Sequence, residues 1–185
     1  MLVETTVLPG VLVLTPKTFG DDRGFFFESF NTQIFSERTG ENCQFVQDNH
    51  SKSVRGVLRG LHYQLGKPQG KLIRVVEGAI FDVAVDIREG SPYFGQWVGV
   101  ELTAENKKQL WVPPDFAHGF LVMSDSAQVL YKATDFYSPE HERSIIWSDE
   151  NIVIDWPDLG IDPILSQKDT DAPKLNDAEL PKLIS

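Results

Sequence analysis

The sequence predicts a single domain of the all-β class, folded as an antiparallel sandwich or barrel. Short segments rich in β-branched and aromatic residues recur roughly every dozen residues, separated by Gly, Pro, Asp or Asn. Helical patterns are scarce, so alternating βαβ units are not expected. A chain of 185 residues can bury a sizeable core, and no linker or repeat divides residues 1–185.

The expected elements follow one another along the chain. Strands are predicted at residues 72–76, 79–87, 97–102, 108–112, 118–122 and 128–134, after an earlier strand within 55–64. Short helices are predicted at 31–39 and 176–180. From Asp155 onward the chain is irregular and rich in Pro, Asp and Leu, which predicts a segment that wraps around the sheets.

Composition narrows the class of protein and its compartment. The formal net charge is -10 and the pI is near 4.8, which disfavours a nucleic-acid binder. Cys43 is the single cysteine, so no internal disulfide can form, and we interpret it as a packing residue. The sequence contains no apolar run of about 20 residues and no secretory signal pattern. We therefore expect a cytoplasmic protein.

One part of this acidic chain is free of acids. Residues 49–76 contain no Asp or Glu, and they contain six cationic side chains: Lys52, Arg55, Arg59, Lys67, Lys71 and Arg74. Such a window predicts a local anion site, and the alternative is an ordinary solvated basic face. We favour the site because His62 and several glycines fall inside the same window.

The spacing within this window is similar to the metal motif of cupin barrels, with the metal ligands replaced. Gly56 and five further residues lead to His62, but Gln64 stands where a second His is usual, and Lys71 replaces the Glu that precedes a later Gly. Pro113-x-Asp115-x-x-His118 imitates the second cupin motif. Two histidines beside an ammonium make a poor metal site, so no metal is expected.

The same residues suit acid–base chemistry better. A neutral imidazole such as His62 can take a proton from a carbon beside a carbonyl, and Lys71 could steady the enolate oxygen. Tyr131 could return a proton from the other face, although a core tyrosine is the simpler interpretation of its pattern. In the 79–87 strand Asp82 faces away from the apolar side. It could orient a histidine in a polar interior or simply face solvent.

Several motifs together resemble the dTDP-4-dehydrorhamnose 3,5-epimerase family. They are RGLHYQ at 59–64, DRGFF at 22–26, QDNHS at 47–51, GKLIR at 70–74, PxxFAHGF at 113–120, YxPxxE at 137–142 and LSxKD at 165–169. They cover almost the whole chain in the family's order. The resemblance implies a cupin-like jelly roll, with a few short helices and an irregular C-terminal segment, that assembles as a homodimer.

The resemblance also implies an activity and a set of roles. The expected reaction inverts C3 and C5 of dTDP-4-dehydro-6-deoxy-D-glucose, giving dTDP-4-dehydro-L-rhamnose for dTDP-L-rhamnose biosynthesis, without metal or cofactor. The implied catalytic residues are His62 as base, Asp169 as its partner, Lys71 at the enolate and Tyr131 as acid. The implied substrate-binding residues are Arg23, Phe26, Glu28, Gln47, Asn49, Arg59, His118, Tyr137 and Glu142. The segment from Arg23 to Glu28 is implied to come partly from the neighbouring subunit.

Strand geometry raises one difficulty for this site. In a regular strand Leu58, Gly60 and His62 share one face and Arg59 lies on the other. The strand must therefore bulge or twist, with Gly60 as the candidate position, to bring Arg59 and His62 together. Three rival functions share some of these features: a single-site C3 or C5 epimerase for another deoxysugar, a metal-dependent cupin isomerase or oxygenase, and a non-catalytic sugar-binding barrel.

Overall fold

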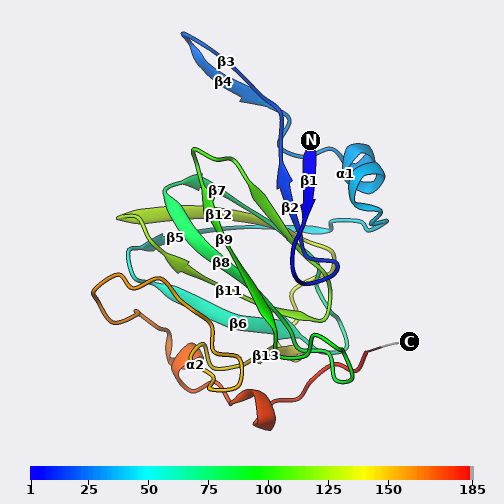
Figure 1. The fold of residues 1–185 in the computed structure, drawn as a ribbon, viewed down its shortest axis with the longest axis vertical. Helices are drawn as coiled ribbons and strands as arrows, with labels where there is room; N and C mark the ends of the chain where they lie inside the picture. The colour runs from blue at the N-terminus through cyan, green and yellow to red at the C-terminus, as the bar shows by residue number, and fades with distance from the viewer. Residues whose placement is uncertain (184–185) are drawn as a thin grey trace.

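The computed structural model describes residues 1–183 (Figure 1). Thirteen strands dominate it: β1 Leu2–Thr5, β2 Leu12–Thr15, β3 Thr18–Asp21, β4 Gly24–Phe27, β5 Gln47–Val54, β6 Leu58–Gln64, β7 Lys71–Glu77, β8 Ala79–Asp86, β9 Trp97–Thr103, β10 Gln109–Val112, β11 Phe116–Val122, β12 Ser126–Ala133 and β13 Glu142–Ser144. Two α-helices, α1 Thr32–Thr39 and α2 Gln167–Thr170, and one 3₁₀ turn, η1 Leu175–Asp177, complete the set. The predicted all-β class is confirmed.

The strands form two facing sheets and a separate hairpin. One sheet has the order β1-β2-β10-β7-β12-β5, and the other has the order β13-β6-β11-β8-β9. Every pairing between named strands is antiparallel. The arrangement is a sandwich of two sheets with jelly-roll character, and not a fully closed barrel.

The space between the sheets contains the main core. Ile73, Val75 and Val129 from the six-stranded sheet are buried with Ile80 and Ala84 from the five-stranded sheet. In β8 the even-numbered residues face this interior. Because strand side chains alternate, Asp82 also points inward, which confirms the polar interior considered for this strand.

The C-terminal segment covers the outer face of the five-stranded sheet. Val83 and Val85 of β8 pack there against Ile152 and Leu175. The predicted wrapping segment is therefore confirmed. The predicted helix at 176–180 is wrong in extent, because only the 3₁₀ turn Leu175–Asp177 forms, and the chain then runs on in extended form to a bridge between Glu89 and Lys182.

The N-terminal third differs most from the expectations. Helix α1 is confirmed, with Asn31 Oδ1 accepting a bond from Ile34 N as the N-cap. Strands β1 to β5 were not predicted, although Asp22 and Arg23 form a turn just before Gly24 that could have signalled the β3–β4 hairpin.

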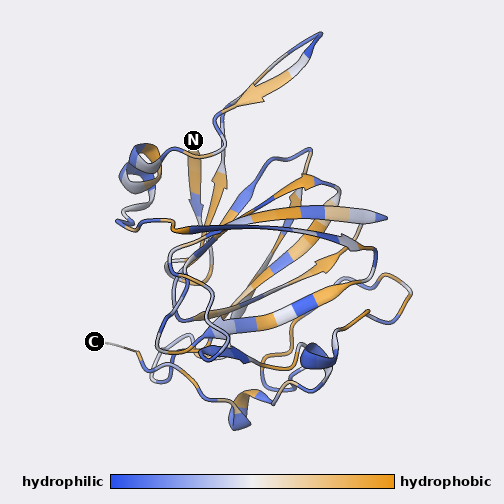
Figure 2. Ribbon diagram, turned by 180° about the vertical axis from the view of Figure 1, so that it is seen from behind, coloured by the Kyte–Doolittle hydropathy of each residue, from blue (hydrophilic) through white to orange (hydrophobic). Residues whose placement is uncertain are grey.

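The hairpin of β3 and β4 stands away from the two sheets in Figure 1. It exposes three aromatic side chains: Phe19 at 55%, Phe25 at 64% and Phe26 at 73%. Figure 2 shows the hydrophobic colouring on its strands. Exposed apolar surface of this kind marks an interaction site in many proteins.

Within residues 1–183, no helix is long and apolar enough to cross a bilayer.

Candidate active site

A bulge in β6 brings Arg59 and His62 to the same face. His62 lies opposite His118 of β11, whereas Arg59 lies opposite Phe120, so three steps on β6 match two on β11. Gly60 permits the close approach, because a Cβ there would lie 2.6 Å from the Cα of Gly119. The bulge expected near Gly60 is confirmed, and it resolves the conflict of strand parity.

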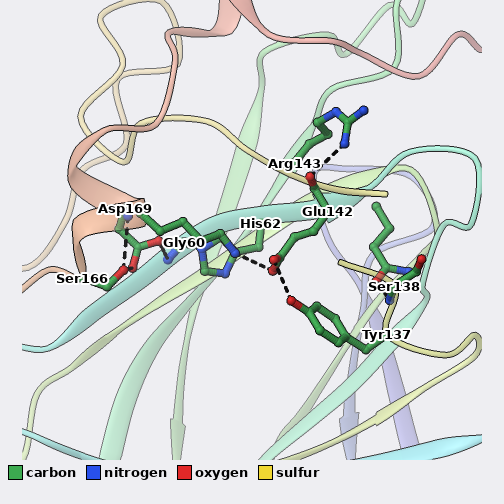
Figure 3. A network of polar contacts seen from close by, with 10 residues as sticks. Gly60, His62, Tyr137, Ser138, Glu142, Arg143, Ser166 and Asp169 are labelled. Atoms are coloured by element: carbon green, nitrogen blue, oxygen red, sulfur yellow. Dashed lines mark hydrogen bonds and ion pairs between the residues drawn. The ribbon is translucent and has the colours of Figure 1, made fainter. Parts of the chain in front are cut away.

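His62 is paired with Asp169, as Figure 3 shows. The imidazole Nε2–H donates to Asp169 Oδ1 at 2.6 Å, which leaves Nδ1 as the basic nitrogen. The carboxylate also accepts from Ser166 Oγ at 2.7 Å and from Gly60 N at 3.4 Å. Ser166 in turn caps α2 by accepting from Asp169 N, so the short helix fixes the position of the carboxylate.

The environment sets the charge states of this pair. Burial lowers the pKa of His62, and nearby Lys168 and Lys71 lower it further, against the opposing effect of Asp169. Burial alone would raise the pKa of Asp169, but the hydrogen bonds from His62 and Ser166 outweigh it, so the pKa of Asp169 lies below its usual range. The result is a neutral imidazole beside an ionised carboxylate, which is the arrangement of a general base.

Lys71 and Tyr131 approach the site from the opposite sheet. They lie on the interior face of neighbouring strands β7 and β12, where Tyr131 pairs with Ile73 and Lys71 with Ala133. Burial lowers the pKa of Lys71 to about 8, although Glu142 and Asp82 act to raise it. Burial and Glu142 raise the pKa of Tyr131, so its hydroxyl is protonated. His62 and Tyr131 thus project into one interior from opposite sheets.

Glu142 joins two further residues at the mouth of the site. Its Oε2 accepts from the Tyr137 hydroxyl at 2.9 Å (Figure 3), and its Oε1 forms an ion pair with Lys168 Nζ. Lys168 was not predicted as a site residue. It lies inside the LSxKD motif, next to Asp169, and a basic side chain adjacent to the carboxylate expected to pair with His62 was the signal available in the sequence.

His118 forms a second histidine–carboxylate pair on the neighbouring strand. Its Nε2–H donates to Asp82 Oδ1 at 2.7 Å, and Asp82 is fully buried. The suggested role of Asp82 as a partner for a histidine therefore matches the structure. The other carboxylate oxygen, Oδ2, is buried without a hydrogen-bond partner among the described residues.

Polar side chains of β5 border the same interior. Arg59 Nε and Nη2 both donate to Ser53 Oγ at 3.1 Å. Gln47 Nε2 donates to Asn49 Oδ1 at 3.0 Å, and Gln47 Oε1 accepts from Tyr137 N at 2.9 Å. Strand β5 forms an edge of its sheet, so this row of polar groups is open to a ligand.

The hairpin residues are not brought to this site within one chain. Arg23 is 89% exposed and bonds Asp21, and Glu28 bonds Asn31. The hairpin lies at the end of the molecule away from β6 and α2 in Figure 1. Arg23, Phe26 and Glu28 could join the site only if a neighbouring subunit supplied them.

The donor groups of the site are arranged for proton transfer. Both histidines of the interior are bonded to carboxylates, and Lys71 occupies the position of the replaced cupin carboxylate. No group of three or more His, Cys, Asp or Glu side chains in residues 1–183 could hold a metal ion. A jelly roll with a neutral base, a facing phenol and a buried ammonium defines an acid–base enzyme for carbon acids.

Comparison with known proteins gives the family. Residues 5–177 match the family model for dTDP-4-dehydrorhamnose 3,5-epimerase. The chain is 60% identical over 181 residues to that enzyme from Salmonella typhimurium and 58% identical over 179 residues to that from Pseudomonas aeruginosa, each match covering 97% of this chain and 98% of the relative.

A solved structure agrees over the full length. The epimerase of Legionella pneumophila, in complex with dTDP-4-keto-L-rhamnose, superposes with a TM-score of 0.97 at 51% identity and covers 100% of this chain and 99% of that one. The chain belongs to the dTDP-4-dehydrorhamnose 3,5-epimerase family and is an isomerase.

Proposed function

We propose that this chain inverts C3 and C5 of dTDP-4-dehydro-6-deoxy-D-glucose and so forms dTDP-4-dehydro-L-rhamnose, the keto sugar of dTDP-L-rhamnose biosynthesis. The observation that carries the proposal is the His62–Asp169 pair facing Lys71 and Tyr131 across the sandwich interior. In this proposal His62 is the base, Lys71 stabilises the enolate, and Tyr131 is the acid on the opposite side of the substrate.

Each inversion follows the same sequence of proton transfers. His62 Nδ1 removes the proton from the carbon beside the C4 ketone, and the C–H electron pair becomes a C=C bond as the ketone oxygen becomes an enolate. The Lys71 ammonium stabilises that oxygen. The C=O bond then re-forms, and the carbon takes a proton from the Tyr131 hydroxyl on the other face. Solvent exchange restores His62 and Tyr131.

Binding of the nucleotide sugar is assigned to the remaining polar residues. Arg59 and Asn49 would hold the diphosphate side of the ligand, because both lie in the acid-free window, and Gln47, which precedes the window, would orient Asn49 through its hydrogen bond. Tyr137 would pack against a ring of the substrate, since its side chain is 51% exposed beside the site. The Glu142 carboxylate and His118 Nδ1 would accept hydrogen bonds from hydroxyl groups of the nucleotide sugar.

We also infer a homodimer in which the β3–β4 hairpin of one subunit completes the site of the other. The exposed Phe26 and the free guanidinium side of Arg23 support this, because neither reaches the interior of its own chain. The lone Cys43, which permits no internal disulfide, supports a cytoplasmic location.

Proton NMR of the substrate in deuterated water, with EDTA present, tests the reaction. We expect deuterium at both C3 and C5 and formation of the L-sugar. Exchange at one carbon alone would assign the chain to the single-site epimerases. Tyr131→Phe should lower formation of the inverted product more than the first exchange; an equal loss of both would contradict the two-face scheme.

Subunit complementation tests the shared site. His62→Ala and Arg23→Ala should each be impaired, but a refolded mixture should recover about a quarter of the wild-type activity, since half of the dimers then contain one intact site. His62→Ala mixed with Asp169→Asn is the matched control, because both residues lie in one chain and cannot complement. No recovery in the first mixture would rule out the shared site.

A further inference from the structure

Gln64 stands two residues beyond His62 on β6, where metal-binding cupins place a second histidine ligand. Because strand side chains alternate, Gln64 shares the interior face with His62. It is 4% exposed, and a buried amide requires hydrogen-bond partners. The hydrogen-bond partners of Gln64 indicate which structural role this position has in place of metal binding.

The amide oxygen of Gln64 accepts a hydrogen bond from the segment that follows β12. The amide nitrogen donates to that segment and to the turn that follows β6. Oε1 accepts from Ser138 N at 2.8 Å. Nε2 donates to Phe136 O at 3.2 Å and to Lys67 O at 2.8 Å. One side chain therefore joins β6 to residues 136 and 138, on either side of Tyr137.

Residues 134–141 connect β12 to β13 and lead directly into Glu142. Figure 3 shows Tyr137, Ser138 and Glu142 together at the site. This connection has little apolar anchorage, since Phe136 is 62% exposed and Tyr137 is 51% exposed. Polar bonds must hold it, and the amide of Gln64 supplies two of them from the same strand as the base.

We propose that Gln64 is a positioning residue that fixes the 134–142 segment so that Tyr137 and Glu142 reach the substrate. The inference rests on the substrate-binding roles proposed above for Tyr137 and Glu142. The position that binds a metal in metal-dependent cupins here connects the 134–142 segment to β6, the strand that carries His62. Gln64 acts through the backbone on both sides of Tyr137 and does not itself take part in proton transfer.

Gln64→Met keeps the volume of the side chain and removes its hydrogen bonds. We expect faster hydrogen exchange in peptides covering residues 134–142 and a KM about tenfold higher, with kcat changed less than about threefold. Gln64→Glu keeps the acceptor for Ser138 N and loses the amide donors, so it should give an intermediate result and serves if the methionine variant fails to fold.

Gln128→Met is the matched control. Gln128 lies on β12, and its amide bonds Glu77 and His50 away from the interior, so this variant should leave KM and exchange of the segment unchanged. Wild-type exchange and KM in both Gln64 variants would overturn the proposal. A lower thermal midpoint of Gln64→Met with unchanged KM would also overturn it, because Gln64 would then act on stability alone.

A double-mutant cycle with Tyr137→Phe separates this inference from the proposed role of Tyr137. If Gln64 acts through Tyr137, the double variant should raise KM by less than the product of the single effects. Fully multiplicative effects would overturn that route. If Tyr137→Phe alone leaves KM unchanged, the role of Tyr137 fails, whereas exchange and KM of Gln64→Met still decide the role of Gln64.

Discussion

Two histidine–carboxylate pairs lie side by side in this molecule. They differ in the solvent exposure of the histidine and in the element that supplies the carboxylate. His62 and His118 are direct cross-strand partners on β6 and β11. The His62 side chain is 27% exposed and the His118 side chain is 9% exposed. Asp169 comes from the C-terminal segment, whereas Asp82 comes from the adjacent strand β8 and is fully buried.

The difference matches the two tasks proposed for these histidines, proton abstraction by His62 and substrate binding by His118. A base must meet the carbon from which it takes a proton, so the more open ring of His62 suits that step. A buried ring that donates Nε2–H to a strand carboxylate has one fixed direction and keeps Nδ1 as an acceptor, so in the proposed complex His118 suits a hydrogen bond from a hydroxyl of the sugar. The Ser166 and Gly60 bonds to Asp169 have no counterpart at the unpartnered Oδ2 of Asp82.

The largest contrast is expected from removing each ring. His62→Ala should lower deuterium exchange at C3 and C5 by about 10³-fold, because it removes the base. His118→Ala should cost about tenfold, mainly in KM, because it removes one hydrogen bond to the substrate. Single-turnover exchange followed by NMR measures both. Equal losses in the two variants would break the assignment of different roles.

The carboxylates should follow with a smaller effect. Asp169→Asn places an amide N–H against His62 Nε2 and favours the wrong tautomer, so kcat should fall about 10²-fold. Ser166→Ala keeps the carboxylate and removes one bond to it, which should cost no more than about fivefold. Steady-state kinetics would detect a reversed order, which would contradict the orienting role of Asp169.

The smallest effect concerns the pH profile of kcat/KM. Lys71 must be protonated to stabilise the enolate, so activity should fall as pH rises through its pKa of about 8. The charge of Asp82 raises the pKa of Lys71, so Asp82→Asn should move this alkaline limb to lower pH. The acid limb should lie below the ordinary value for histidine, because burial lowers the pKa of His62.

Lys71→Arg is the control for that profile. An arginine stays charged over the whole range, so the alkaline limb near pH 8 should disappear even if the rate is lower. An unchanged limb in Lys71→Arg would assign it to another group. A limb that does not move in Asp82→Asn would mean that Asp82 serves His118 alone.

The sequence predicts strands well where hydrophobic residues alternate over long segments. The 79–87 segment is the clearest case, and the strands from β7 to β12 all appear near their expected positions. Strands β1 to β4 are only four residues each, too short for a periodic pattern to stand out. Residues 176–180 contact distant elements, since Glu179 O accepts from the Tyr63 hydroxyl and Ala178 and Leu180 pack against the outer face of the five-stranded sheet, and local propensity does not contain these contacts.

The site was predictable to the extent that a motif carried it. His62, Lys71 and Tyr131 converge because the sheets bring their strands together, whereas Asp169 reaches His62 from helix α2 of the C-terminal segment. Lys168 was missed because its partner Glu142 lies on another element, and the ion pair exists only in the folded chain. The sequence alone shows that Arg59 and His62 would lie on opposite faces of a regular strand. The bulge that brings them to one face is seen only in the register between β6 and β11.

The C-terminal segment has a consequence for the way this enzyme loses activity. The segment that shields Val83 and Val85 from water is the same stretch of chain that carries Asp169 to the base. If that stretch detached while the two sheets stayed folded, His62 would lose the Asp169 carboxylate, and the outer face of the five-stranded sheet would be exposed to solvent at the same time. Under the proposed mechanism, such a local opening would stop catalysis and expose apolar surface together, with no need for the sandwich itself to unfold.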